Sequence, residues 1–161
     1  MDLESQISLA RLIRGQRIAS LGTLRQGAPF VSMVLYAVSP DFSEFYIHVS
    51  RLAHHTQDLL QDARVSLMIT ETDREDVDPQ VLARVSLLGT VELIPAEVHE
   101  YQASRSAYLA KFPQAAQNFS LADFSLYRIR PQSARFVAGF GKIYNLTPNS
   151  FAQVAGIQSD S

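Results

Sequence analysis

Apolar residues recur at helical spacing near the start of the chain. They are Leu3, Ile7, Leu9, Ala10, Leu12 and Ile13. Residues three or four positions apart lie on one face of a helix, so this spacing predicts an amphipathic helix over about residues 3–14. The pattern stops at Arg14-Gly15, where the glycine predicts a C-cap.

Alternating apolar and polar positions follow this helix in four runs. The runs cover residues 17–39, 44–50, 63–71 and 82–94, and they are rich in β-branched residues. Such alternation is typical of strands with one buried face. Turn-forming residues at Arg25-Gln26-Gly27-Ala28 divide the first run into a hairpin, so the four runs predict five strands.

The second half of the chain predicts a helix and more β-structure. Residues 95–112 have helical spacing and begin with Pro95, a residue favoured at the first position of a helix. Residues 121–140 predict a sixth strand, or a sixth and a seventh with a break near Pro131. The acidic segment 70–80 is expected to be a solvated connection, and the tail, about residues 148–161, is expected to be flexible.

These elements predict a single domain over residues 1–161, of the α+β class and mainly β. Sequential strands joined by short turns favour an antiparallel sheet. Six or seven strands in so short a chain must curl or close to protect their edges. The expected architecture is therefore a small antiparallel β-barrel with peripheral helices.

Composition narrows the classes of function. The 161 residues are 47% hydrophobic, and 14 basic and 16 acidic residues give a net charge of −2. No basic surface is indicated, so neither nucleic acid nor membrane is expected as a partner. The absence of cysteine excludes thiolate chemistry. The first residues contain no continuous apolar run that would form a signal peptide, which favours a cytoplasmic protein.

The stretch HVSRLAHHTQDLLQD (48–62) leads from a strand into a short helix and carries most of the candidate chemistry. Ser50, Arg51, His55 and Thr56 could hold a phosphate through hydroxyl groups, a guanidinium and the helix N-terminus. The alternative is that Ser50 or Thr56 only caps the helix. Adjacent helical residues point about 100° apart, so His54 and His55 cannot share one metal ion, and no metal site is predicted. His54 is expected in solvent and His55 facing inward.

Catalytic residues are not identifiable from spacing. No paired carboxylates and no nucleophile, histidine and acid arrangement can be singled out, and the serines in SLMI and SLLG lie on strands without a nucleophile elbow. This disfavours a hydrolase. The segment GFGKIYNL (139–146) predicts either a turn that ends the last strand or a close backbone approach, with Lys142 available to an anion.

Three segments carry a family resemblance that covers about residues 5–147. HVSRLAHHTQDLLQDARVSLMI, GTLRQGAPFVSMVLYAV and RFVAGFGKIYNL resemble the pyridoxamine-phosphate-oxidase-like FMN-binding split barrels. The resemblance is strongest to the branch with haem-utilisation proteins, in which a strand is followed by Ser-x-Leu-x-x-His-Thr-x-Asn-Leu. Here Gln57 stands where that branch often has arginine, and Asp58 stands where it usually has asparagine.

The resemblance implies an FMN site and a homodimer. Ser50, Arg51, His55 and Thr56 would hold the phosphate, and Lys142 could also reach an anion. A partner subunit would complete the site through Arg135 or Phe136, with ARFVAGF and VSLLGTV as contact surfaces. The positions that match the flavin slot are Ser32, Met33, Val34, His48 and Val49.

Three functions follow. The first is an FMN-dependent oxidoreductase that acts on a small molecule, because a flavin carries its own redox chemistry and needs no visible catalytic residue. The second is haem binding or haem degradation, although haem-binding relatives carry a histidine in a C-terminal extension that lies outside these 161 residues. The third is a non-catalytic dimeric binding protein that has lost its flavin, for which Gln57 and Asp58 are the indication.

Overall fold

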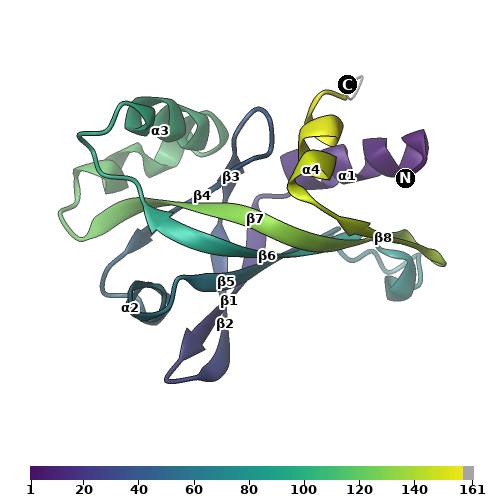
Figure 1. The fold of residues 1–161 in the computed structure, drawn as a ribbon, viewed down its shortest axis with the longest axis horizontal. Coiled ribbons are helices and arrows are strands. Elements are labelled where there is room, and N and C mark those ends of the chain that lie inside the picture. The colour runs from purple at the N-terminus through teal and green to yellow at the C-terminus, as the bar shows by residue number, and fades with distance from the viewer. Residues whose placement is uncertain (158–161) are drawn as a thin grey trace.

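Eight strands form one antiparallel sheet in the computed structural model, which describes residues 1–157. The strand order is β2-β1-β5-β6-β7-β4-β3, and β8 pairs with β7. Figure 1 shows the long strands β6 and β7 crossing the middle of the molecule. The strands are β1 (Ile18–Arg25), β2 (Ala28–Leu35), β3 (Ala37–Val38), β4 (Phe45–Ser50), β5 (Arg64–Thr70), β6 (Arg84–Leu93), β7 (Phe124–Gly139) and β8 (Lys142–Leu146). The predicted class, a mainly β antiparallel split barrel with peripheral helices, is confirmed.

Helices pack around this sheet. They are α1 (Leu3–Gly15), α2 (His54–Gln61), α3 (Glu100–Lys111) and α4 (Pro148–Ala155), with 3-10 helices η1 (Pro79–Val81) and η2 (Pro113–Ser120). Helices α1 and α4 lie together at one end of the molecule, and α2 lies at the other end below α3 (Figure 1). No helix within residues 1–157 has the length and apolar character needed to cross a membrane.

The side chains of β4 point alternately into two separate hydrophobic cores. Phe45, Ile47 and Val49 point into the barrel, whose core also contains the apolar faces of α1 and α4. The intervening Tyr46 belongs to a smaller core under α3 and η2. Successive side chains of a strand face opposite sides, so β4 is covered on both faces.

Of the two predictions for residues 121–140, the single strand is confirmed and the break near Pro131 is wrong, because β7 continues through this residue. The register between β6 and β7 shifts by one residue at this point, pairing Leu88 with Ser133 and Gly89 with Pro131. The extra residue is Gln132, a β-bulge that lets a strand accommodate proline. Gly89 is required there, since an added Cβ would overlap the carbonyl oxygen of Arg130.

Three predicted boundaries of secondary-structure elements also need correction. Gly15 is the last residue of α1 and Gln16 is the C-cap, with its N–H bonded to the Leu12 carbonyl. The helix predicted from Pro95 begins only at Glu100, because Pro95 and the residues after it form a turn closed by the N–H of Val98. In the tail expected to be flexible, residues 148–155 form α4, and residues 158–161 lie outside the described part of the chain.

The hairpins follow local turn chemistry. Gln26 and Gly27 both have positive φ, 52° and 82°, as a two-residue type I′ turn requires. The predicted turn after the last long strand is also present, because Phe140-Gly141 joins β7 to β8. Of the two interpretations of 139–146, the structure therefore has a hairpin turn, followed by the additional strand β8.

Candidate functional site

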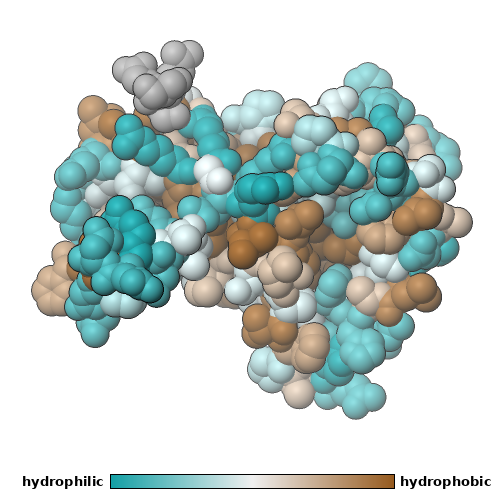
Figure 2. Space-filling view, turned by 180° about the vertical axis from the view of Figure 1, so that it is seen from behind, coloured by the Kyte–Doolittle hydropathy of each residue, from teal (hydrophilic) through white to brown (hydrophobic). Residues whose placement is uncertain are grey.

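One face of the sheet, called here the outer face, is formed by the outward residues of β2, β1, β5, β6, β7 and β8. Cross-strand pairing places Gly22, Ser66, Leu88 and Ser133 in one row across this face. Large apolar side chains are exposed at its β2 edge, including Val31 (66%) and Met33 (64%). Seen from behind in Figure 2, apolar side chains gather near the middle of the molecule and on the protruding β1–β2 hairpin.

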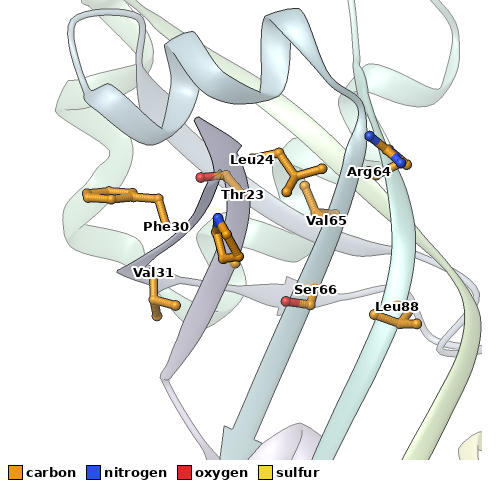
Figure 3. Close-up of a pocket in the computed structure, with 10 residues that line it drawn as sticks. Thr23, Leu24, Phe30, Val31, Arg64, Val65, Ser66 and Leu88 are labelled. Carbon is orange, nitrogen blue, oxygen red and sulfur yellow. The ribbon is translucent and has the colours of Figure 1, made fainter. Parts of the chain in front are cut away.

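Hollow 1, of about 260 Å³, lies on the outer face near the β1–β2 hairpin. Figure 3 shows Phe30 and Val31 of β2 on one side, Leu88 of β6 on the other, and Ser66 of β5 between them. The floor of hollow 1 is formed at Gly22 and Ser66, where no large side chain rises from the sheet. The two residues are in close contact, because a Cβ added to Gly22 would overlap the Ser66 hydroxyl. The lining residues are Gly22, Thr23, Leu24, Pro29, Phe30, Val31, Arg64, Val65, Ser66 and Leu88.

Hollow 2, of about 370 Å³, continues this surface toward β8 and shares Ser66 and Leu88 with hollow 1. Arg135 lies in it, paired across the strands with Ser86 and Asn145. Among the described residues, no acid lines either hollow, and Arg135 has no ion pair. Arg64, at the far end of hollow 1, is held by Asp62 at 2.6 Å. The joined hollows are therefore an apolar strip with an unneutralised cation at one end.

None of the four histidines lines either hollow in the described chain. His48 is buried, and its ring stacks on Phe119 at 3.7 Å between centroids. Burial, together with the charge of Arg105, lowers the pKa of His48 to about 4. His54 accepts at Nδ1 from Arg25, 3.0 Å away, because a guanidinium can only donate. Neutral His54 then carries its proton on Nε2 and presents no lone pair there.

The stretch before α2 is fixed to the start of β7 by polar contacts. The Ser50 hydroxyl donates to the carboxylate of Asp123 at 2.5 Å, and Arg51 donates to the Ala122 carbonyl at 2.7 Å. The N-cap of α2 is Ala53, which makes no side-chain cap. The simple helix-cap hypothesis is therefore wrong for both Ser50 and Thr56.

Three predicted site residues carry buried polar atoms without a hydrogen-bond partner in the described structure. They are Ser32 Oγ on β2, and His55 Nε2 and Thr56 Oγ1 on α2. Helix α2 packs against both β1 and β2. Burial also lowers the pKa of His55, although Asp58 acts in the opposite direction. Buried polar groups are hydrogen-bonded in the great majority of cases. These three unpaired atoms therefore indicate that a ligand with polar groups along one edge can bind at the α2–β2 junction.

Asp58 is neutralised inside the protein. Its carboxylate accepts from Thr23 at 2.9 Å and from Arg25 at 3.0 and 3.2 Å, and Arg25 in turn lies over the Phe30 ring at 4.2 Å. The hydrogen bonds from Arg25 hold the pKa of Asp58 below its usual value. Asp58 is therefore a brace between α2 and β1, while Gln57 is exposed.

The remaining predicted residues lie apart from α2. Val34, Val49 and Phe136 are in the barrel core, so Phe136, with 0% exposure, cannot reach a second subunit, whereas the exposed Arg135 can. Met33 is exposed on β2. Lys142 on β8 pairs with Glu4 at 2.8 Å. Figure 1 shows β8 and α2 at opposite ends of the molecule, so one chain does not bring all the predicted residues together.

Sequence reasoning missed several residues of this site. Ser66 was recognised only as part of a strand, Leu88 only as part of a contact segment, and Arg64 was not singled out. Alternation could have placed all three outward, opposite Val65 and Leu87 in the core. Asp123, which lies 73 residues from Ser50, left no local signal.

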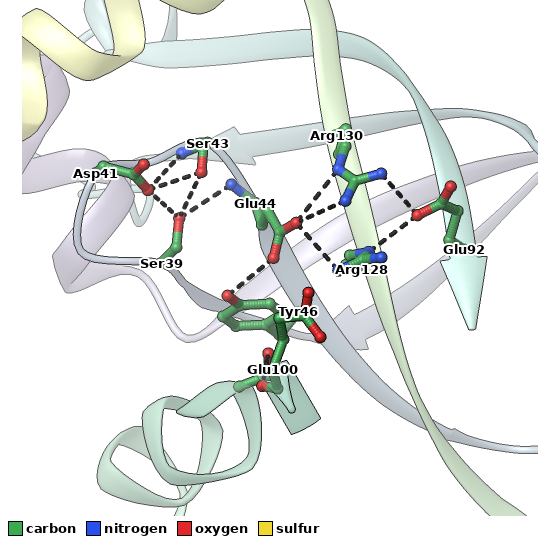
Figure 4. A network of polar contacts seen from close by, with 10 residues as sticks. Ser39, Asp41, Ser43, Glu44, Tyr46, Glu92, Glu100, Arg128 and Arg130 are labelled. Carbon is green, nitrogen blue, oxygen red and sulfur yellow. Dashed lines mark hydrogen bonds and ion pairs between the residues drawn. The ribbon is translucent and has the colours of Figure 1, made fainter. Parts of the chain in front are cut away.

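A second polar cluster contains only internal pairs. Arg128 and Arg130 of β7 each contact both Glu44 and Glu92, at 2.7 to 3.5 Å, and Tyr46 donates to Glu44 (Figure 4). Two positive and two negative groups balance. This network ties β4, β7 and β6 together and needs no ligand.

Known proteins resemble this chain along most of its length. A chloroplastic protein of Arabidopsis thaliana named non-canonical heme oxygenase HOZ is 37% identical over 131 residues, which are 80% of this chain and 38% of that protein. A solved heme binding protein from Mycobacterium smegmatis is 30% identical with a TM-score of 0.81, over 95% of this chain and 61% of that one. The chain thus spans about two fifths and three fifths of these two relatives.

A more distant structure shares the fold alone. It is a Clostridium acetobutylicum protein described as belonging to the pyridoxinephosphate oxidase family, with 15% identity and a TM-score of 0.68, over 94% of this chain and 99% of that one. The resemblance to the split barrels of this class is thereby confirmed. Residues 2–153 match the family described as CREG, beta-barrel, and the chain therefore belongs to the CREG beta-barrel family.

Proposed function

We propose that this protein binds haem, or a closely related planar tetrapyrrole, in the joined hollows 1 and 2 of the outer face. The observation that carries this proposal is the apolar strip with a low floor at Gly22 and Ser66, which ends at Arg135, a residue without an ion pair in the described part of the chain. A flat apolar ring fits such a floor, and a carboxylate arm fits a guanidinium. The similarity to a plant heme oxygenase and a mycobacterial heme binding protein supports the same ligand.

The residues present fit the ring and its carboxylates but not the iron. Val31 and Leu88 would exclude water from the ring, and Arg135 would hold a carboxylate. Within the described chain, no histidine lines the hollows. Haem supplies iron-centred redox chemistry when it is bound, and oxidative haem degradation is the activity to assay. No residue of this chain is assigned a step in that reaction.

The test is a hemin titration of the purified protein, followed by its Soret absorbance. Ser66→Tyr fills the floor shared by both hollows and should weaken hemin binding at least tenfold. Ser106→Tyr, at an exposed position on α3, is the matched control and should bind as the wild type does. Equal hemin affinity in all three proteins, with unchanged melting temperatures, would refute the outer-face site.

A homodimer that buries the outer face is part of this proposal. The predicted contact segments ARFVAGF and VSLLGTV present Arg135 and Leu88 on this face. Exposed apolar residues rimmed by polar ones favour association, and two-fold pairing is the commonest form. A second copy would also cover the open side of the hollows.

FMN binding at the α2–β2 junction is the second candidate, and the unpartnered Ser32, His55 and Thr56 atoms favour it. In this case the protein would be an oxidoreductase that acts on a small molecule. Arg51→Ala should weaken FMN roughly tenfold to a hundredfold, since a hydrogen bond to a charged group contributes about 1.5–3 kcal/mol. Riboflavin lacks the phosphate and is the control, since both forms should bind it equally. If Arg51→Ala binds FMN as the wild type does, the phosphate is not held here.

A further inference from the structure

Hollows 1 and 2 offer a porphyrin ring apolar side chains and a cation, but they offer its metal no usual ligand. Within the described residues, their lining contains no histidine, methionine, tyrosine or cysteine, the residue types that ligate haem iron in proteins. The lining does contain the hydroxyl groups of Ser66, Ser86 and Ser133. A hydroxyl oxygen can accept a hydrogen bond, and the pyrrole N–H groups of a metal-free ring are donors.

The four histidines lie elsewhere in the chain. The ring of His48 stacks on Phe119, and His54 accepts from Arg25. His55 Nε2 is buried at the α2–β2 junction, and His99 is the residue before α3. Residues 158–161 contain none of the four ligand types. The composition of the 161 residues therefore leaves methionine as the type to examine on the outer face.

Two methionines lie beside the hollows on this face. Met33 and Met68 are 64% and 38% exposed, and both line a separate hollow of about 440 Å³. Cross-strand pairing places Met68 next to Ser86 of hollow 2, although neither methionine belongs to the lining of hollow 1 or 2. A thioether is therefore the alternative iron ligand that an experiment has to exclude.

The groups that fit the ring act in the same way with or without a metal. Val31 and Leu88 offer apolar contact, which depends on the area of the ring. Arg135 has no ion pair within residues 1–157, and its guanidinium suits a carboxylate arm. Neither contribution changes when the centre of the ring holds iron or two protons.

We infer that the outer-face site recognises the porphyrin ring and its carboxylates and not the metal, so that a metal-free porphyrin dicarboxylate is as good a ligand as haem. This inference rests on the proposed function, because it concerns the same site and narrows its ligand class. Arg135 selects for the carboxylates, and the serine hydroxyls accept from the pyrrole N–H groups of the metal-free ring.

Protoporphyrin IX, its dimethyl ester and hemin are the probes. The first two are followed by porphyrin fluorescence, and hemin is followed by its Soret absorbance and by its displacement of protoporphyrin IX. The affinities of protoporphyrin IX and hemin should agree within about tenfold. Arg135→Gln should weaken both by about tenfold or more and leave the uncharged ester unaffected. Arg11→Gln, at an exposed position on α1, is the matched control and should bind all three probes as the wild type does.

Hemin that binds more than about tenfold more tightly than protoporphyrin IX would overturn the inference and leave the outer-face haem site in place. The double replacement Met33→Leu and Met68→Leu should change neither affinity. A loss of hemin binding alone in that variant would reveal a thioether ligand and also overturn the inference. If Arg135→Gln weakens the ester as much as the acids, the carboxylate contact is wrong. If neither hemin nor protoporphyrin IX binds the wild type, the proposed function itself fails.

Discussion

Replacement of Thr56 by valine tests the α2–β2 junction directly. Thr56 is 0% exposed, and its hydroxyl has no hydrogen-bond partner within residues 1–157. Burial of an unpaired hydroxyl costs about 1–3 kcal/mol by protein mutational data. Thr56→Val keeps the shape and removes that cost, so the unliganded protein should become more stable by about this amount. For a chain of this size, the melting temperature should rise by about 2–4 °C per kcal/mol.

Thr23 provides the matched control. It is similarly buried, at 3% exposure, but its hydroxyl donates to Asp58 at 2.9 Å. Thr23→Val should therefore lower the melting temperature, in the opposite direction from Thr56→Val. Differential scanning calorimetry without ligand measures both. A lower melting temperature for Thr56→Val would mean that its hydroxyl has a partner, and the argument for a polar ligand at this junction would then be wrong.

Three further predictions concern stability and assembly. Tyr36→Phe removes the donor to the Ile13 carbonyl in the last turn of α1 (2.7 Å), and calorimetry should show a loss of about 1–3 kcal/mol; unchanged stability would contradict this. Since the pKa of Asp58 is lowered in the folded state, its stabilisation is present above its unfolded pKa of about 3.9 and is lost as pH falls through the folded value. Below about pH 4, the melting temperature of Asp58→Asn should therefore fall less steeply with pH than that of the wild type. Equal slopes for the two proteins would refute this prediction. Sedimentation should give twice the 17.9 kDa chain mass for the wild type and the single mass for Leu88→Lys, whereas 17.9 kDa for both would exclude the dimer.

The sequence predicted the fold well because its signals are local. Helical spacing gave α1, alternation gave β5 and β6, and Gln26-Gly27 gave the first hairpin. The alternative with a break at Pro131 was wrong, because the rule that excludes proline from strands does not anticipate a bulge opposite Gly89. That bulge depends on close backbone contact between β6 and β7, and the sequence alone does not show that these two strands pair.

The candidate site was predicted only in part, since its partners are distant in the chain. His55 and Thr56 were expected to face a ligand, and among the described residues their polar atoms are buried without partners. Arg135 or Phe136 was expected at a subunit contact, and of the two Phe136 takes the inward position of β7 while Arg135 takes the outward one. Choosing between neighbours on a strand needs the register relative to the core, which the sequence did not fix.

The acid that would repel a phosphate at the start of α2 is Asp123, and not Asp58, to which the family resemblance pointed. Asp58 replaces the usual asparagine, but Arg25 and Thr23 satisfy its carboxylate, so its charge is compensated within the protein. Asp123 instead reaches Ser50, the residue that the phosphate hypothesis needs as a donor. A phosphate at Ser50 would have to displace a carboxylate that already accepts its hydrogen bond, and like charges would repel there. The outer face carries no such conflict, because its hollows have Arg135 and no acid in their described lining. This difference in charge is the physical reason to test haem before FMN.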